Sequence, residues 1–211
     1  MEAVRDSDKK YRKARFVHCY DWREFRGSLF RAALDSQQIG KIIGRQLASE
    51  GHINDLHVVG VSVGAFAADT CIKEFRRLRG MESQQGNGES KYNKKVGSRL
   101  TFLDPFTSRG IFGSGYGNRF FGNEADFCEQ FMNTDDPVPS TNSPLPGAHV
   151  YDVTTSRQRE GFVPLSGDSM HSWPVAFYGI NWKDKIDPRA KNPLFKPCHT
   201  EKPRGTLTKL D

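Results

Sequence analysis

The feature that most constrains the fold of this 211-residue chain is the junction at residues 56–79, where an apolar run passes directly into a helical pattern. Residues 56–61 (LHVVGV) are apolar and β-branched, which is typical of a buried strand. Residues 64–79 carry apolar side chains at helical spacing, namely Ala68, Cys71, Ile72, Phe75 and Leu78. A strand followed at once by a helix predicts a crossover unit of a parallel sheet.

Other segments repeat this alternation. Further strands are predicted at residues 14–21, 99–106, 127–133 and 148–154, and further helices at 28–49 and 171–182. The pattern predicts an α/β fold with a mostly parallel sheet of about five strands and flanking helices. In the helix at 28–49 we expect the buried stripe to contain Ile39, Ile42, Ile43 and Leu47, extended by Leu29, Ala33 and Leu34.

We expect one folded domain at residues 14–182, with a charged extension at 1–13 before it. Gly80 is expected to end the helix at 64–79, and residues 81–98 (MESQQGNGESKYNKKVGS) to form a flexible polar insertion. Residues 183–211 are basic, contain four prolines and have little apolar pattern, so we expect a mobile tail.

Charge and cysteine usage exclude several classes of function. The net charge is +6, and the two ends at residues 1–15 and 183–211 hold 6 + 8 basic against 3 + 4 acidic residues, so the middle is close to neutral. No basic stripe with interleaved aromatic residues is present, so no nucleic-acid partner is expected. No apolar run approaches 18 residues and no leader is visible, so we expect neither a membrane span nor a signal peptide in this sequence.

The four cysteines are widely spaced, and none forms a C-x-x-C pair. Cys19, Cys71 and Cys128 lie in apolar segments and are interpreted as small core residues. No grouping of His, Asp and Glu along the chain has metal-ligand spacing, so neither a metal nor a cofactor is expected.

The turn between strand and helix carries the pattern Gly60-x-Ser62-x-Gly64. A sharp turn at this place strains the serine backbone and exposes its hydroxyl, and small residues two positions away avoid clashes. Ser62 would then stand at a helix N-terminus, where the N–H of Val63 could stabilise a developing anion. The context favours Ser62 as a nucleophile.

A nucleophilic serine needs a base, and the base needs an orienting acid. Asp104 ends the strand after the turn, Asp136 follows the next strand, and His171 lies beyond the last one. The carboxyl ends of parallel strands meet at one edge of a sheet, so these groups are candidates for a Ser-Asp-His constellation. The weaker candidate bases are His18, His52, His57 and His149, interpreted as core or surface residues.

Several of these segments resemble lipases and esterases of the α/β-hydrolase fold. DLHVVGVSVGAFAAD is similar to the nucleophile segment of pancreatic-type lipases, which has the form HVIGHSLGAH, and LTFLDPF is similar to the Leu-Asp-Pro strand end that holds their acid. DSMHSWPVAFYG resembles the histidine-bearing segment, and the similarity covers about residues 14–182. The Leu-Asp-Pro match implies Asp104 as the acid, whereas TDDPVP resembles a fungal-type segment that implies Asp136. We favour Asp104 and keep Asp136 as the alternative.

The sequence departs from the family in two places. Val61 stands before the serine where the lipases commonly have histidine. HCYDWRE resembles a strand that the family precedes with further strands and a His-Gly loop, and that loop supplies a second oxyanion N–H. Nothing similar precedes Ala14, so we expect either a truncated chain, whose missing part could include a signal peptide, or a second donor from elsewhere.

Two functions follow from these observations. The first is a serine hydrolase that cleaves a small-molecule or lipid ester through an acyl-enzyme, with transient contact to a lipid surface. Residues 107–123 and 137–147 would border its acyl site. The second is a catalytically impaired or truncated relative that serves as a binding or interaction module. The sequence specifies neither the cellular location nor the oligomeric state.

Overall fold

The structure is a computed structural model that describes residues 17–20, 29–50, 53, 55–85, 97–109, 113–138, 140–164, 169–185 and 202–210. Five strands form one sheet in the order β1-β2-β3-β4-β5, and every neighbouring pair is parallel. They are β1 (Asp55–Val61), β2 (Gly97–Leu103), β3 (Phe127–Met132), β4 (His149–Asp152) and β5 (Leu207–Lys209). An α/β fold with a parallel five-stranded sheet and flanking helices is thereby confirmed.

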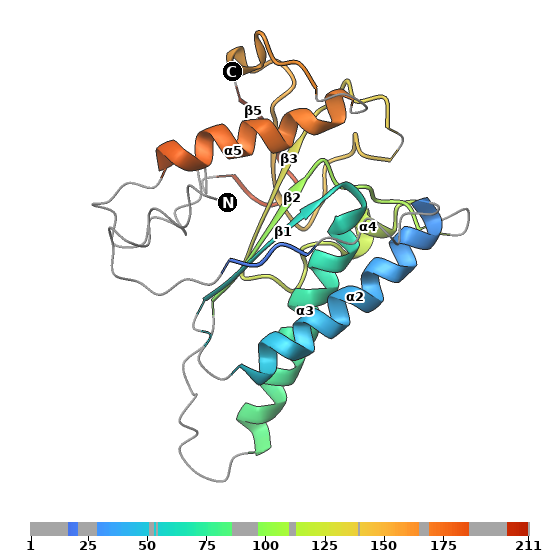
Figure 1. Ribbon diagram of the computed structural model, residues 1–211, viewed down its shortest axis with the longest axis vertical. Helices are drawn as coiled ribbons and strands as arrows, with labels where there is room; N and C mark the ends of the chain where they lie inside the picture. The colour runs from blue at the N-terminus through green and yellow to red at the C-terminus, as the bar shows by residue number, and fades with distance from the viewer. Residues whose placement is uncertain are drawn as a thin grey trace.

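Helices cover both faces of this sheet (Figure 1). On one face lie α2 (Leu29–Ser49) and α3 (Ala65–Gln85), with the short α4 (Tyr116–Phe120) beside them. On the other face lies α5 (Trp173–Lys185). Short 3₁₀ turns occur at η2 (Ser62–Gly64), η4 (Arg157–Arg159) and η5 (Met170–Ser172).

Each face has its own apolar core, as a sheet covered on both sides requires. The core under α2 and α3 includes Phe66, Ile72, Phe75, Leu100, Phe102 and Phe121. The core under α5 consists of Leu103, Phe131, Tyr151, Val153, Trp173 and Phe177. The expected stripe of α3 is confirmed, because Ala68, Cys71, Ile72 and Phe75 are buried and Leu78 packs against this core.

The predicted buried stripe of α2 is only partly correct. Ala33 is buried and Leu47 packs against the core, but other large apolar residues of the stripe do not form the buried face. Ile42 is 63% exposed and Leu34 is 47% exposed, while the buried face consists of the small residues Ala32, Ala33, Ser36, Gly40, Gly44 and Ala48. A Cβ atom on Gly40 would clash with the Ala67 carbonyl oxygen, and one on Gly44 would lie 2.6 Å from the Cys71 carbonyl oxygen. Small residues therefore let α2 approach the α3 backbone, and this close approach decides which face is buried.

Two further predictions for the first half of the chain, a strand and the end of a helix, are also wrong. Residues 17–20 form no strand, and Cys19 is exposed rather than buried, whereas Cys71 and Cys128 are buried as expected. Gly80 does not end α3, which continues to Gln85 into the expected insertion. A single exposed glycine costs a helix only about 1 kcal/mol, which neighbouring turns can offset. Residues 86–96 lie outside the described residues.

The expected mobile tail at residues 183–211 is wrong for its last part. Residues 202–210 return to the sheet, and β5 pairs with β4 in the register Val150↔Leu207. The guanidinium of Arg204 donates to four backbone carbonyl oxygens at 2.9–3.1 Å, those of Gly122, Ala125, Asp126 and Gly147. The chain after α5 thus supplies the fifth strand, which the pattern of residues 14–21 was expected to supply.

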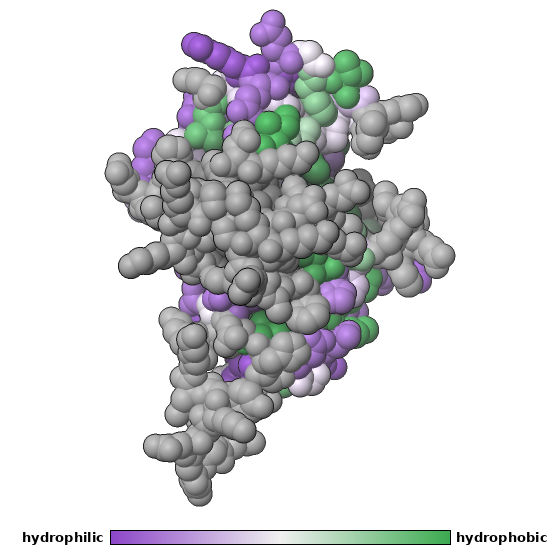
Figure 2. All heavy atoms as spheres, turned by 60° about the vertical axis from the view of Figure 1, so that its left-hand side comes forward, coloured by the Kyte–Doolittle hydropathy of each residue, from purple (hydrophilic) through white to green (hydrophobic). Residues whose placement is uncertain are grey.

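Exposed apolar side chains lie on separate elements. Among the described residues the larger ones include Leu34 and Ile42 on α2, Val59 and Val61 on β1, and Val175 and Ile180 on α5. Figure 2 shows one face of the molecule, on which the coloured residues include both hydrophobic and hydrophilic side chains. In the described part of the chain, no helix is both long and apolar enough to span a bilayer.

Candidate functional site

The turn after β1 has the backbone that the sequence pattern predicts. Ser62 follows the last residue of β1 and adopts φ +52°, in the left-handed region that non-glycine residues rarely occupy. A Cβ atom on Gly60 would lie 2.8–2.9 Å from Ala68, Ala65 and Gly64, so glycine is required there. A Cβ on Gly64 would meet nothing within 4 Å, so Gly64 is not required by packing.

Asp104 occupies the equivalent position after the neighbouring strand. Val61 pairs with Leu103, so Ser62 and Asp104 follow paired residues at the same edge of the sheet. Asp104 also has a positive φ of +46°, a conformation that aspartate tolerates better than most residues. The N–H of Phe106 donates to the Ser62 carbonyl oxygen at 3.1 Å and links the two strand ends. Strained residues of this kind are held where the surrounding structure determines the backbone.

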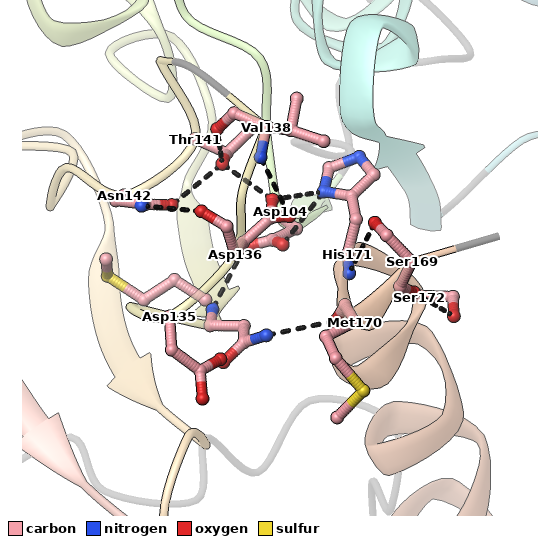
Figure 3. Close-up of polar contacts among 12 residues, drawn as sticks. Asp104, Asp135, Asp136, Val138, Thr141, Asn142, Ser169, Met170, His171 and Ser172 are labelled. Atoms are coloured by element: carbon pink, nitrogen blue, oxygen red, sulfur yellow. Dashed lines mark hydrogen bonds and ion pairs between the residues drawn. The ribbon is translucent and has the colours of Figure 1, made fainter. Parts of the chain in front are cut away.

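His171 is brought to this edge by the 3₁₀ turn before α5. The Ser169 hydroxyl accepts a hydrogen bond from the His171 N–H at 3.2 Å and begins the turn. The His171 Nδ1 atom lies 2.9 Å from Asp104 Oδ2 and 2.7 Å from Asp136 Oδ2 (Figure 3). Both carboxylates are fully buried, and the imidazole is 18% exposed. Both candidate acids therefore contact the same nitrogen of the candidate base.

These contacts perturb the titration of the cluster. Burial raises the pKa of Asp104 to about 6, even though hydrogen bonds from His171 and from the Asn133 N–H act to lower it. The neighbouring Asp136 adds to the increase. Burial acts to lower the pKa of His171, but the two aspartates outweigh burial and raise it above its usual value.

The other nitrogen of the imidazole, Nε2, is buried and has no hydrogen-bond partner among the residues that the structure describes. In Figure 3 it points away from the two aspartates. Ser62 is half-buried, and the described residues include no hydrogen bond between its hydroxyl and His171. Val63 lies in the first helical turn, where backbone N–H groups have no acceptor within the helix.

Asn133 is a site residue that the sequence interpretation missed. Its N–H donates to Asp104 Oδ1 at 2.9 Å, and its side-chain amide donates to the Met170 carbonyl oxygen at 3.0 Å. It thereby links the acid after β2 to the turn that carries His171. Its place directly after β3, at the carboxyl edge of the sheet, is the signal that could have identified it.

The chain matches no protein-family model, no curated protein and no solved structure.

The same three side chains form a group that the spacing along the chain did not predict. One ligand atom from each of Asp104, Asp136 and His171 lies within 4.8 Å of the others, close enough to hold a metal ion together. Both carboxylates lie at hydrogen-bond distance from Nδ1. This arrangement also occurs where carboxylates orient an imidazole by hydrogen bonds, without a metal ion. Among the described residues no further group of this kind occurs.

The remaining histidines that the structure describes have other roles. His57 Nε2 lies 2.9 Å from the Thr101 hydroxyl within the sheet, and His149 stacks on Phe127 and bonds the Lys202 carbonyl oxygen. His18 is exposed, and His52 lies outside the described residues. The two expected border segments contact each other, because the Thr107 N–H and hydroxyl both donate to the Ser140 carbonyl oxygen at 2.8–3.0 Å.

Proposed function

We propose that this protein is a serine hydrolase of the α/β-hydrolase type that cleaves carboxylic esters through an acyl-enzyme. The observation that carries the proposal is the contact of His171 Nδ1 with Asp104 and Asp136 at the sheet edge where Ser62 adopts a strained conformation. His171, Asp104 and Asp136 come from three separate chain segments, so proximity along the sequence does not explain their contact. Ser62 follows β1 at the same edge of the sheet.

In this mechanism the Ser62 hydroxyl attacks the ester carbonyl carbon while His171 Nε2 accepts its proton. Among the residues that the structure describes, Nε2 has no hydrogen-bond partner, so it can accept this proton if the Ser62 hydroxyl reaches it in the substrate complex. Catalytic hydrogen bonds often form only when substrate is bound. The Val63 N–H then stabilises the oxyanion, and the imidazolium returns its proton to the leaving alcohol.

The acids keep the imidazole in the tautomer with hydrogen on Nδ1, which leaves Nε2 as the acceptor. His171 must be neutral to accept a proton. Its pKa is raised, so ester turnover should increase with pH through a midpoint above the usual 6.5. The substrate class consistent with this chemistry is a carboxylic ester, of a small molecule or of a lipid.

The test is hydrolysis of p-nitrophenyl esters of increasing chain length by the wild type and by Ser62→Ala. We expect turnover by the wild type and a loss of about 10³-fold or more in Ser62→Ala, because the nucleophile is removed. Ser49→Ala, an exposed serine at the end of α2, is the matched control and should retain full activity. Equal turnover by Ser62→Ala would show that another group attacks the ester.

The alternative is a catalytically impaired relative that acts as a binding or interaction module. It is favoured by one observation, the absence of a Ser62–His171 hydrogen bond. A folded wild type that turns over no ester of any chain length would support this alternative.

A further inference from the structure

The geometry of His171 is unusual because two carboxylates face one nitrogen. A neutral imidazole carries a single hydrogen on Nδ1, yet Asp104 Oδ2 at 2.9 Å and Asp136 Oδ2 at 2.7 Å are both within hydrogen-bond distance of it. Burial differs little between the two acids, since the side chains of both are fully buried. Neither distance nor exposure therefore singles out one of them as the acid.

Each carboxylate is also held by donors of its own. Asp104 Oδ1 accepts the Asn133 N–H at 2.9 Å. Asp136 Oδ1 accepts the Val138 N–H at 3.1 Å, and its Oδ2 lies 2.8 Å from the Thr141 hydroxyl (Figure 3). These donors do not depend on His171. Each carboxylate would therefore remain in place, and keep facing Nδ1, if the other were neutralised.

We propose that Asp104 and Asp136 are a duplicated pair of positioning residues, either of which suffices to hold His171 with its hydrogen on Nδ1. The consequence for catalysis rests on the proposed function, but the tautomer of His171 does not. A site with a single acid would lose the tautomer when that acid became an amide, and such a change costs a serine hydrolase about 10⁴-fold in rate. A duplicated pair predicts that no single change has this effect.

The experiment compares the wild type, Asp104→Asn, Asp136→Asn and the double variant. Asn keeps the shape of each side chain and an oxygen acceptor for its local donors. Asp135→Asn is the matched control, because this neighbouring carboxylate pairs with Arg159 and has no contact with His171. The first readout is the ¹⁵N chemical shifts of the His171 ring at a pH where it is neutral, which distinguish the two tautomers without any need for activity. The second is the rate at which a fluorophosphonate labels Ser62.

We expect the Nδ1–H tautomer in the wild type, in the control and in both single variants, and its loss only in the double variant. Labelling should fall less than about 10-fold in each single variant and about 10³- to 10⁴-fold in the double variant. Loss of the tautomer in one single variant, with the other unchanged, would overturn the proposal and identify that residue as the sole acid. A double variant that kept the tautomer would overturn it as well.

Circular dichroism establishes whether each variant is folded. If a single variant does not fold, the hydrogen-bonded Nδ1 proton of the wild type remains measurable, and its coupling across the hydrogen bonds to ¹³C-labelled carboxyl groups reports the acceptors. Coupling to both carboxyls supports the pair. In the single variant that does fold, an Nδ1 proton without coupling to the remaining carboxyl contradicts it. If the fluorophosphonate does not label Ser62 of the wild type but the His171 tautomers behave as expected, the proposed function is wrong. The proposal of a duplicated Asp104 and Asp136 pair is then still supported.

Discussion

At the residue scale, the site depends on two residues with positive φ at neighbouring strand ends, Ser62 and Asp104. Such backbone conformations cost about 1–3 kcal/mol each and persist only where surrounding contacts determine them. The hydrogen bonds from Phe106 to Ser62 and from Asn133 to Asp104 are contacts of this kind. The same network stabilises these strained conformations and positions His171, because the Asn133 side chain donates a hydrogen bond to the carbonyl oxygen of the preceding residue, Met170.

Asp104 and His171 should make stability depend on pH. The native pKa of Asp104 is about 6, whereas an unfolded aspartate has a pKa of about 3.9. Between these values the native protein holds a proton that the unfolded chain has lost. His171 acts in the same direction from pH 6.5 up to its raised native pKa. Since stability falls with pH wherever the native state binds more protons, the contribution of these two groups is fully present below about pH 4 and decreases above it.

Urea unfolding at pH 4.5, 5.5, 6.5 and 7.5 tests this dependence on the wild type and on Asp104→Asn. Groups with lowered pKa values, such as Glu74 and Asp126, contribute equally to the pH dependence of both proteins, so the comparison cancels their contribution. We expect the stability of the wild type relative to the variant to decrease from pH 4.5 to 6.5. A relative stability that increased over this range would mean that Asp104 has a lowered rather than a raised pKa.

The residues of the site were predictable to different degrees. Ser62, Asp104 and His171 could be assigned to one edge of the sheet in advance because parallel strands end there. The contact of Asp104 with His171 is confirmed, whereas the described residues include no hydrogen bond between Ser62 and His171. The choice between Asp104 and Asp136 could not be made, and the structure explains this, since both contact Nδ1. Asn133 was missed because its contacts use its backbone N–H and a long-range carbonyl oxygen, so its place directly after β3 was the only signal in the sequence.

At the scale of the elements, the helices and most strands follow from periodicity, but the buried face of α2 does not. The helix was predicted at 28–49 and lies at Leu29–Ser49. Its buried stripe consists of small residues, because α3 lies too close for isoleucine side chains. Periodicity of large apolar residues identifies a helix that packs on a sheet, whereas contact between two helix backbones selects for small size.

Alanine substitutions at two glycines test this packing. Gly40→Ala should destabilise the fold by about 1–3 kcal/mol, because the new methyl group would overlap the Ala67 carbonyl oxygen. Gly80→Ala is the control, since Gly80 is an exposed helical residue whose Cβ would meet nothing within 4 Å. It should be neutral or stabilise by up to about 1 kcal/mol, as helix propensity predicts. Chemical denaturation measures both, and a stabilising Gly40→Ala would contradict the close approach of α2 and α3.

At the scale of the whole molecule, the sheet is completed by residues 202–210, which the sequence did not identify as structured. β5 has only three residues, and none of them is fully buried, so no apolar pattern predicts this strand. Its position depends on Arg204 and on the backbone bonds from Gly205 to Ala148 and from Leu210 to Asp152. Such long-range partners cannot be recognised from a short basic segment. Residues 202–210 thereby become part of the fold.

Substitution of Arg204 tests this closure. Arg204→Ala removes the donor of four carbonyl oxygens and should destabilise the protein by about 2–3 kcal/mol. It should also speed hydrogen exchange at the amides of Gly205 and Leu210. Lys209→Ala, which removes an equal charge from an exposed position of β5, should change stability by less than about 0.5 kcal/mol. Equal effects of the two substitutions would show that charge, and not the bonds of the guanidinium, holds the segment.

The central claim is that Ser62 is a nucleophile activated by His171. Reaction of the folded wild type with a fluorophosphonate, followed by peptide mapping by mass spectrometry, tests it most directly. The Ser62 oxygen would bond to phosphorus and displace fluoride, while His171 takes the hydroxyl proton. We predict one adduct, on the peptide that contains Ser62, and none in Ser62→Ala. An unlabelled folded wild type, or an equally labelled Ser62→Ala, would contradict the account.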